Sequence, residues 1–173
     1  MKIEQLKKQI EEHTSKITEL KNQMMTELRK DFHGALVELF DAYPFIHAIH
    51  FTAFTPMFND GDECTFSSHH DDCGFNGFDS YVDTKSEHVS GAFGEIEGEN
   101  ILENSRETIY AYEHKTYKSI PNPNFNALHK KAVEDFRSAL NAVSEENWKE
   151  LVGDHCIVMI DRKGINVAEY DHG

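Results

Sequence analysis

IEQLKKQIEEHTSKITELKNQM, residues 3–24, sets the organisation of the whole chain. Core-type residues return in it after alternating steps of three and four, which is the heptad pattern of a coiled coil. This heptad seam consists of Ile3, Leu6, Ile10, His13, Ile17, Leu20 and Met24. Isoleucine at the first core position and leucine at the second favour a parallel two-stranded coil. We therefore expect the segment to join two copies of the chain as a homodimer, with an antiparallel hairpin inside one chain as the alternative.

The apolar spacing changes after the seam. Apolar residues then recur at steps of four, at Leu28, Phe32, Leu36 and Phe40. This spacing is typical of a helix that packs one face against a globular core. Pro44 disfavours helical geometry in the residue before it, so the helix is expected to end near residue 42. The pattern predicts an N-terminal helix over residues 1–42, with a coiled coil in its first part, and a domain over residues 43–173.

Two hairpins are predicted in that domain. Residues 45–57 are rich in Phe, Ile and Thr, as strands are. The sequence FNDGD (58–62) is a strong turn because Asp-Gly tolerates positive φ. Residues 63–70 are therefore expected to return as the second strand. Residues 155–161 and 165–171 flank a short basic turn and predict the other hairpin.

Two helices are predicted between the hairpins. Asn124 is the expected N-cap of the first, whose apolar face runs to Val143. Ser144 is the expected N-cap of the second, and Gly153 is expected to end it.

Residues 71–119 are acidic and rich in glycine, and they predict an irregular insertion in which residues 100–114 form a helix. Together these elements predict the α+β class. The expected architecture is an antiparallel sheet of about four strands with helices packed on one face, preceded by the long N-terminal helix.

The negative charge of the chain is concentrated in its middle. The formal net charge is −14, and residues 58–114 hold 14 acidic and two basic residues, which leaves −12 in that segment. Such a segment repels the phosphates of nucleic acids and attracts basic proteins. We expect a basic protein partner and no direct nucleic-acid binding; a solvated loop that aids solubility is the alternative. The expected binding face consists of Asp60, Asp62, Glu63, Asp71, Asp72, Asp79, Asp83, Glu95, Glu97 and Glu99.

The composition predicts a cytoplasmic protein without a membrane segment. No run of about 18 apolar residues occurs, and the N-terminus lacks the apolar stretch of a signal peptide. The three cysteines are an odd count, which argues against a disulfide framework. They are expected to be reduced thiols.

Metal-capable side chains cluster after the first predicted turn. Cysteine, histidine and carboxylate are the usual ligands of zinc and its neighbours in the transition series. The candidate ligands are His50, Cys64, His69, His70 and Cys73. Their spacing contains no C-x-x-C pair. A zinc site is therefore one reading, and a polar strand end with solvated histidines is the other.

Two H-x-T/S motifs begin at His50 and at His88. They are similar to the motifs of the two-histidine phosphoesterases. In that family two histidines act as acid and base on a cyclic phosphate, and the hydroxyls hold the phosphoryl oxygens. The resemblance implies a cyclic-nucleotide phosphoesterase or a protein that sequesters such nucleotides. Chance occurrence among the 11 histidines is the other explanation.

The segment FTAFTPMFNDGDECTF (51–66) resembles one found in small uncharacterised proteins of tailed bacteriophages and bacteria. Those proteins carry an aromatic-rich strand followed by F-N-D-G-D-x-C-x-F. The resemblance covers about a tenth of the chain. It implies an intracellular protein of phage or bacterial origin and supplies no catalytic residue, since no activity is assigned to that family.

These patterns favour a non-enzymatic, self-associating binding protein that engages a basic host protein through its acidic 58–114 segment. A metal-dependent enzyme or metal-stabilised domain built on the His/Cys/Asp cluster is the first alternative. A cyclic-nucleotide phosphoesterase or sponge is the second. No cofactor other than zinc is suggested by the residues.

Overall fold

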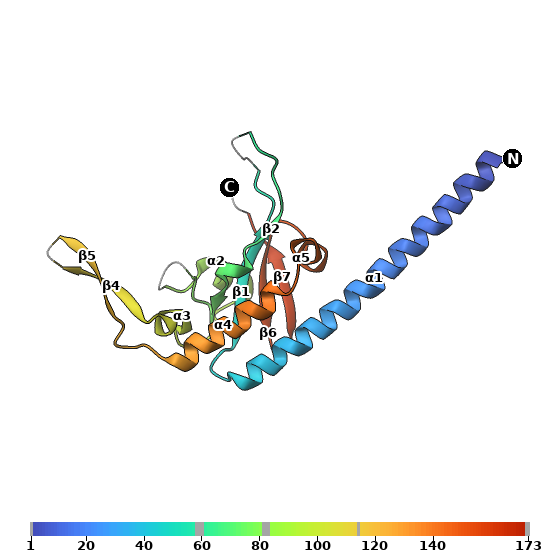
Figure 1. Ribbon diagram of the computed structural model, residues 1–173. Helices are drawn as coiled ribbons and strands as arrows, with labels where there is room; N and C mark the ends of the chain where they lie inside the picture. Colours follow the sequence, from blue (N-terminus) through green and yellow to red (C-terminus); the bar gives the residue numbers. More distant parts are fainter. Residues whose placement is uncertain (1, 58–60, 81–83, 114, 172–173) are drawn as a thin grey trace.

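The computed structural model describes residues 2–57, 61–80, 84–113 and 115–171, without the side chain of Lys2. One long helix, a five-stranded sheet with shorter helices and a separate two-stranded sheet make up the fold (Figure 1). This mixture of helices and antiparallel strands confirms the expected α+β class. The elements are α1 (Lys2–Ala42), β1 (Ala48–Phe54), β2 (Ser67–Ser68), the 3₁₀ helix η1 (His70–Asp72), β3 (Gly74–Phe75), α2 (Glu87–Phe93), α3 (Ile101–Ser105), β4 (Thr108–Glu113), β5 (Thr116–Pro121), α4 (Ala127–Asn141), α5 (Glu145–Val152), β6 (Cys156–Asp161) and β7 (Gly164–Glu169).

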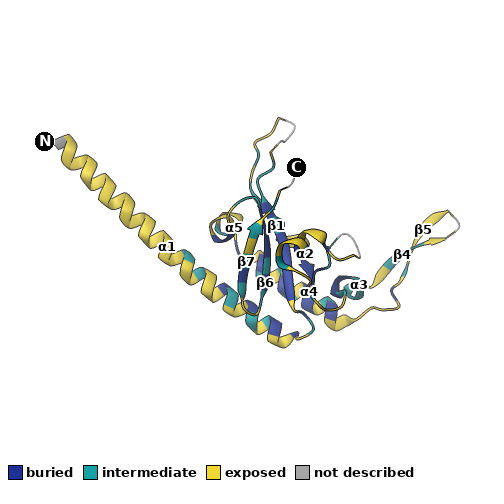
Figure 2. Cartoon of the chain, turned by 180° about the vertical axis from the view of Figure 1, so that it is seen from behind, coloured by how far each residue is buried: buried dark blue, intermediate teal, exposed yellow. Residues whose placement is uncertain are grey.

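The long N-terminal helix is confirmed, and its two halves differ in their surroundings. Every residue from Ile3 to Met24 is exposed, and this half of α1 extends away from the rest of the molecule (Figures 1 and 2). The second half packs on the body through Phe32, Leu36 and Phe40, which are buried on one helical face. The globular body therefore includes the second half of α1.

The main sheet is antiparallel throughout. β1 pairs with β6, and β6 pairs with β7. On its other edge β1 pairs with β3 and then with β2. The hairpin predicted for residues 155–161 and 165–171 is confirmed. The strand predicted for residues 63–70 pairs with β1 as expected, but it is reduced to Ser67–Ser68, and residues 58–60 of the turn lie outside the described residues.

The two faces of the sheet have different cover. Alternate residues of β1 point to opposite faces. Ile49, Phe51 and Ala53 belong to the main core together with side chains of α1, α4 and α5. His50 lies on the other face, near the start of α2, which covers part of that face (Figure 2). The structure thus places helices on both faces, whereas the sequence pattern predicted them on one.

The caps of α4 and α5 show how local signals fix the helices. The Asn126 side chain accepts hydrogen bonds from two backbone N–H groups in the first turn of α4. The prediction of this helix is right, but the prediction that Asn124 caps it is wrong. α5 begins after Ser144, whose hydroxyl accepts a backbone hydrogen bond, and ends before Gly153, as expected.

The helix predicted for residues 100–114 is correct only in its first part. α3 ends at Ser105, and the chain then forms β4. β4 and β5 pair as a two-stranded sheet that extends away from the body on the side opposite the free half of α1 (Figure 1). One face of this hairpin exposes Tyr110, Tyr112 and Tyr117. The insertion therefore contains two helices and a hairpin among its described residues, joined by irregular stretches.

Candidate functional site

A pocket of about 350 Å³ lies on the sheet face that α2 partly covers. Its volume is at the lower end of the range for small-molecule sites. Segments far apart in the sequence meet at it, from β1 to the residue that follows β7. Its ionisable side chains among the described residues are His50, His69, Asp72, Asp79, His88 and Tyr170.

His50 is the most deeply buried of these side chains. It is 3 % exposed, and the register between β1 and β3 places it opposite Gly74. A Cβ at residue 74 would lie closer than 3.0 Å to two ring atoms of His50 and to the carbonyl oxygen of Phe78. The absence of a side chain at Gly74 therefore makes room for the imidazole.

A tight turn brings one carboxylate of the pocket into place. Phe75 and Phe78 exchange backbone hydrogen bonds, of 3.1 and 2.9 Å. Between them, Asn76 and Gly77 both have positive φ, of 50° and 79°, as a type I′ hairpin turn requires. The chain then returns across β3 and places Asp79 in the pocket. The Asn-Gly pair is a sequence signal for such a turn, although the sequence analysis predicts no hairpin at this point.

Aromatic rings line the outer part of the pocket. The Phe54 ring centroid lies 4.7 Å from that of His69 and 6.0 Å from that of Tyr170, and the planes are inclined by 33° and 38°. His88 meets Tyr170 nearly edge-on, with 5.3 Å between the centroids. The four side chains come from β1, the loop before η1, α2 and the residue that follows β7. They give the pocket an aromatic lining.

The pocket carries negative charge. Asp79 is half-buried, Asp72 is exposed, and no lysine or arginine is among the described residues that line the pocket. Burial lowers the pKa of His50 from 6.5 to about 4, against the opposing effects of the Asp79 carboxylate and the Phe78 carbonyl. His50 is therefore neutral near pH 7.

The residues expected to bind zinc are divided between the two sides of the sheet. His50 and His69 line the pocket. His70 and Cys73 are buried on the opposite face of the sheet, where α1, α4 and α5 form the main core. Cys64 is half-buried in the loop before β2. Within the described ranges, no group of three or more His, Cys, Asp or Glu side chains is placed to hold a metal ion.

The two H-x-T/S motifs partly converge. His50 and His88 line the same pocket although 38 positions separate them, and Thr52 lines it as well. The hydroxyl of Ser90 instead donates to the carbonyl of Glu87 within α2. The structure thus brings the two histidines into one pocket, on a strand and a helix, without a basic side chain for a phosphate among the described lining residues.

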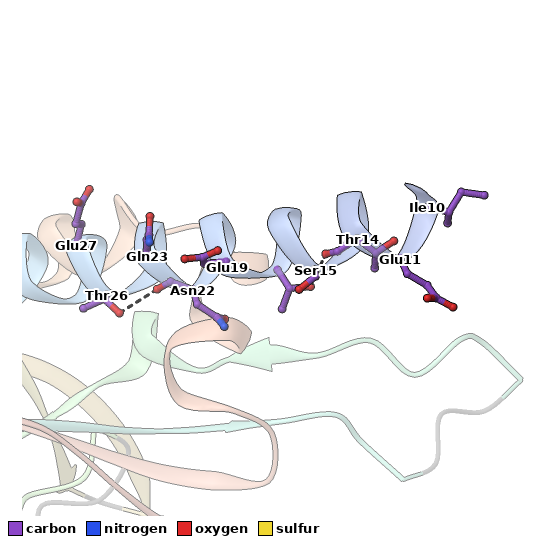
Figure 3. A pocket seen from close by; sticks show the side chains of 10 residues that line it. Ile10, Glu11, Thr14, Ser15, Glu19, Asn22, Gln23, Thr26 and Glu27 are labelled. Carbon is purple, nitrogen blue, oxygen red and sulfur yellow. Dashed lines mark hydrogen bonds between the residues drawn. The ribbon is translucent and has the colours of Figure 1, made fainter. Parts of the chain in front are cut away.

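The heptad seam of α1 is exposed along its whole length. Its six large apolar side chains are between 51 % and 70 % exposed. A shallow hollow runs along another face of the same segment, where Thr14, Ser15 and Asn22 lie (Figure 3). All ten residues that line this hollow belong to α1. It is therefore a surface of one helix, and no wall from another described element encloses it.

The acidic residues expected to form one binding face come from four places in the fold. Asp62 and Glu63 lie in the loop before β2, and Asp71 and Asp72 lie in η1. Asp79 belongs to the pocket, and the remaining described members, Glu95, Glu97 and Glu99, lie between α2 and α3. Asp60 and Asp83 lie outside the described residues.

One of these charges is balanced within the chain, because the Glu95 carboxylate lies 3.0 Å from the Lys85 ammonium. The Glu99 carboxylate lies 3.5 Å from a ring nitrogen of His129. Asp62, Glu63 and Glu97 are exposed.

The search for a membrane span among the described residues and the comparisons with known proteins were both negative. None of the described helices combines the length and the apolar composition needed to cross a bilayer. No protein-family model, no curated protein and no solved structure matches the chain.

Proposed function

We propose that this chain is a self-associating, non-enzymatic binding protein. Its first 24 residues pair with those of a second copy, and its acidic 58–114 segment engages a basic protein. The observation that carries the proposal is the free half of α1. That half is a helix with an apolar seam at heptad spacing, and no described element of its own chain covers the seam.

An exposed apolar seam on a helix in water is a cost that a partner can remove. Most helical stability in proteins comes from packing of one amphipathic face rather than from intrinsic propensity. Burial of one large apolar side chain contributes about 1.5–3 kcal/mol. A second copy offers an identical seam, and isoleucine and leucine in alternation fit a parallel pair. His13, also exposed, is the one polar member of the seam.

The test is the molar mass of the full chain in solution, by light scattering or sedimentation. The double variant Ile10→Gln/Ile17→Gln removes two core positions from each helix and keeps helix propensity high. We expect a dimer for the unchanged chain and a monomer for this variant. The matched control, Ser15→Gln/Asn22→Gln, changes residues outside the seam and is expected to remain dimeric. A monomeric unchanged chain overturns the self-association.

The charge of the 58–114 segment supports the binding of a basic protein. Residues 58–114 carry a net −12, and part of that charge is exposed on the loop before β2 and between α2 and α3. Opposite potentials speed association and weaken as salt screens them. A basic protein is therefore the partner that this surface favours.

The corresponding experiment compares retention of proteins from a bacterial lysate at low and at high salt. We expect basic proteins to be retained at low salt and released at high salt. The triple variant Glu95→Gln/Glu97→Gln/Glu99→Gln is expected to lose them. A control with the same charge change at exposed sites outside the segment uses Glu134, Glu146 and Glu169, each changed to Gln. Equal retention by the two variants overturns the role of the acidic segment.

A further inference from the structure

We propose that the pocket beside His50 binds a guanidinium group, which in the proposed function belongs to an arginine side chain of the basic partner. The inference rests on the proposed function only for the source of the group. The chemistry of the ligand is argued from the pocket itself.

The charge of the lining favours a cation. Asp72 and Asp79 line the pocket, and no lysine or arginine is among the described residues that do so. The Arg106 guanidinium lies next to the lining and donates to the backbone carbonyl of Ser80. Burial holds the pKa of His50 at about 4, so its ring adds no positive charge near pH 7. A cation is attracted by this lining, and a phosphate or carboxylate is repelled.

The aromatic lining also favours a cation. Phe54, His69, His88 and Tyr170 line the pocket. A cation near the face of an aromatic ring is attracted by about 0.5–2 kcal/mol. Guanidinium is planar and donates through a fixed fork of N–H groups, whereas ammonium is a compact and strongly hydrated charge.

The lining also contains hydrogen-bond acceptors. Asp79 is half-buried, and Thr52, Ser80 and Ser86 line the same space. The Ser86 hydroxyl accepts from the Val89 N–H at the start of α2 and keeps a second lone pair. A guanidinium has five N–H donors and no acceptor. Carboxylates and hydroxyls satisfy these donors, and a carboxylate can accept two of them at once. The volume of about 350 Å³ accommodates a side-chain head group with its stem.

Calorimetry and NMR of the histidine ring protons test the proposal on the full chain. The ligand used is N-acetyl-arginine amide, with the lysine and citrulline amides as the ammonium and neutral counterparts. We expect saturable binding of the arginine compound with a Kd on the order of 1 mM, as for a single head group. Binding of the lysine compound is expected to be weaker, and the citrulline compound is not expected to bind. Equal binding of all three, or none by the arginine compound, overturns the proposal, and tighter binding of lysine overturns the choice of guanidinium.

Two variants locate the site. Asp79→Asn removes one charge from the pocket wall and is expected to weaken binding about tenfold. Asp71→Asn removes the same charge from an exposed residue of η1 outside the lining and is expected to leave binding unchanged. Unchanged thermal unfolding of Asp79→Asn shows that the loss is not one of folding. Equal affinities for the two variants place the ligand elsewhere and overturn the assignment.

A last pair of measurements separates the sources of the cation. Methylguanidinium represents a free small molecule, and a peptide with blocked ends whose one charged residue is a central arginine represents a protein partner. We expect the peptide to bind more tightly; tighter binding of methylguanidinium overturns the protein source. The monomeric variant Ile10→Gln/Ile17→Gln is expected to bind the arginine compound as the unchanged chain does. Arginine binding at the pocket is thereby measured independently of self-association and of partner retention, so each of these proposals can be contradicted without the others.

Discussion

The imidazole of His50 occupies the space that a side chain on Gly74 would need, across the pairing of β1 with β3. We therefore expect Gly74→Ala to destabilise the fold. The new methyl group would also approach the backbone carbonyl of Phe78, which cannot move aside as a flexible side chain can. Overpacking of this kind costs about 1–3 kcal/mol, and urea denaturation measures it.

The control for this variant is Gly91→Ala in α2. A Cβ at Gly91 meets no atom within 4 Å. Alanine in a helix interior is about 0.5–1 kcal/mol more favourable than glycine. Gly91→Ala is thus expected to stabilise the chain slightly. Equal stability of Gly74→Ala and the unchanged chain would contradict the close packing of His50.

Local signals were sufficient for several elements of the fold. The 3.6-residue spacing and the Ser144 cap predicted helices that the structure contains, and the short basic turn predicted the C-terminal hairpin. For residues 106–113 the sequence predicts the end of a helix, whereas the structure forms β4 from residue 108. Ile109 and Ala111 are half-buried and Tyr110 and Tyr112 are exposed, an alternation that is typical of a strand.

The pocket could not be predicted in the same way because it depends on tertiary contacts. His50, His69 and His88 were all singled out by sequence, but as metal ligands or as acid–base residues. The alternation of β1 and the turn at Asn76 decide which of the histidines share a surface. His70 follows His69 directly and yet lies on the other side of the sheet, in the core. Adjacency in sequence therefore does not place His69 and His70 on one surface.

The buried His50 predicts a pH dependence of stability. The folded-state pKa of His50 is about 4, below the ordinary 6.5 that applies to the unfolded chain. Between these values the unfolded state binds more protons than the folded state, so stability falls as the pH is lowered from 6.5 toward 4. The loss attributable to this group is about 3 kcal/mol at most. Denaturation across that range measures it.

His50→Gln provides the comparison for this titration, since glutamine stays neutral throughout the range. The variant is expected to lose part of the slope of stability against pH, whatever its absolute stability. An unchanged slope would show that other groups dominate the acid side of the stability curve.

The three cysteines are expected to react at different rates with a thiol reagent. Burial raises the pKa of Cys73 and that of Cys156 to about 11, and both side chains are buried. The thiolate is the reactive form, so these two thiols are protected in the folded protein. Cys64 is half-buried in a loop and is expected to react first. The Cys64→Ser variant should lack the fast phase, and rapid reaction of more than one thiol would contradict the burial of the other two.

Deletion of residues 2–20 tests the division of α1 into a free half and a docked half. The docked half contributes Phe32, Leu36 and Phe40 to the core and stays in place in the shortened chain. The Lys21–Glu150 ion pair is also kept. We expect the shortened chain to be a folded monomer whose Tm does not depend on protein concentration, whereas that of the full chain rises with concentration. A shortened chain that fails to fold would mean that the free half supports the body.

The direction of the helices in the dimer is testable by charge. Lys16 precedes the core residue Ile17 and Lys21 follows Leu20, so a parallel pair brings Lys16 of one helix near Lys21 of the other. Lys16→Glu replaces two repulsive contacts in each dimer by attractive ones, each worth about 0.2–1 kcal/mol. Because Lys21 already contacts Glu150, the lower part of that range is expected. Lys8→Glu is the control, because it makes the same charge change at a position that faces away from the partner helix. Sedimentation should show a tighter dimer for Lys16→Glu and an unchanged dimer affinity for Lys8→Glu. An equal change in dimer affinity for both variants would contradict a parallel pair.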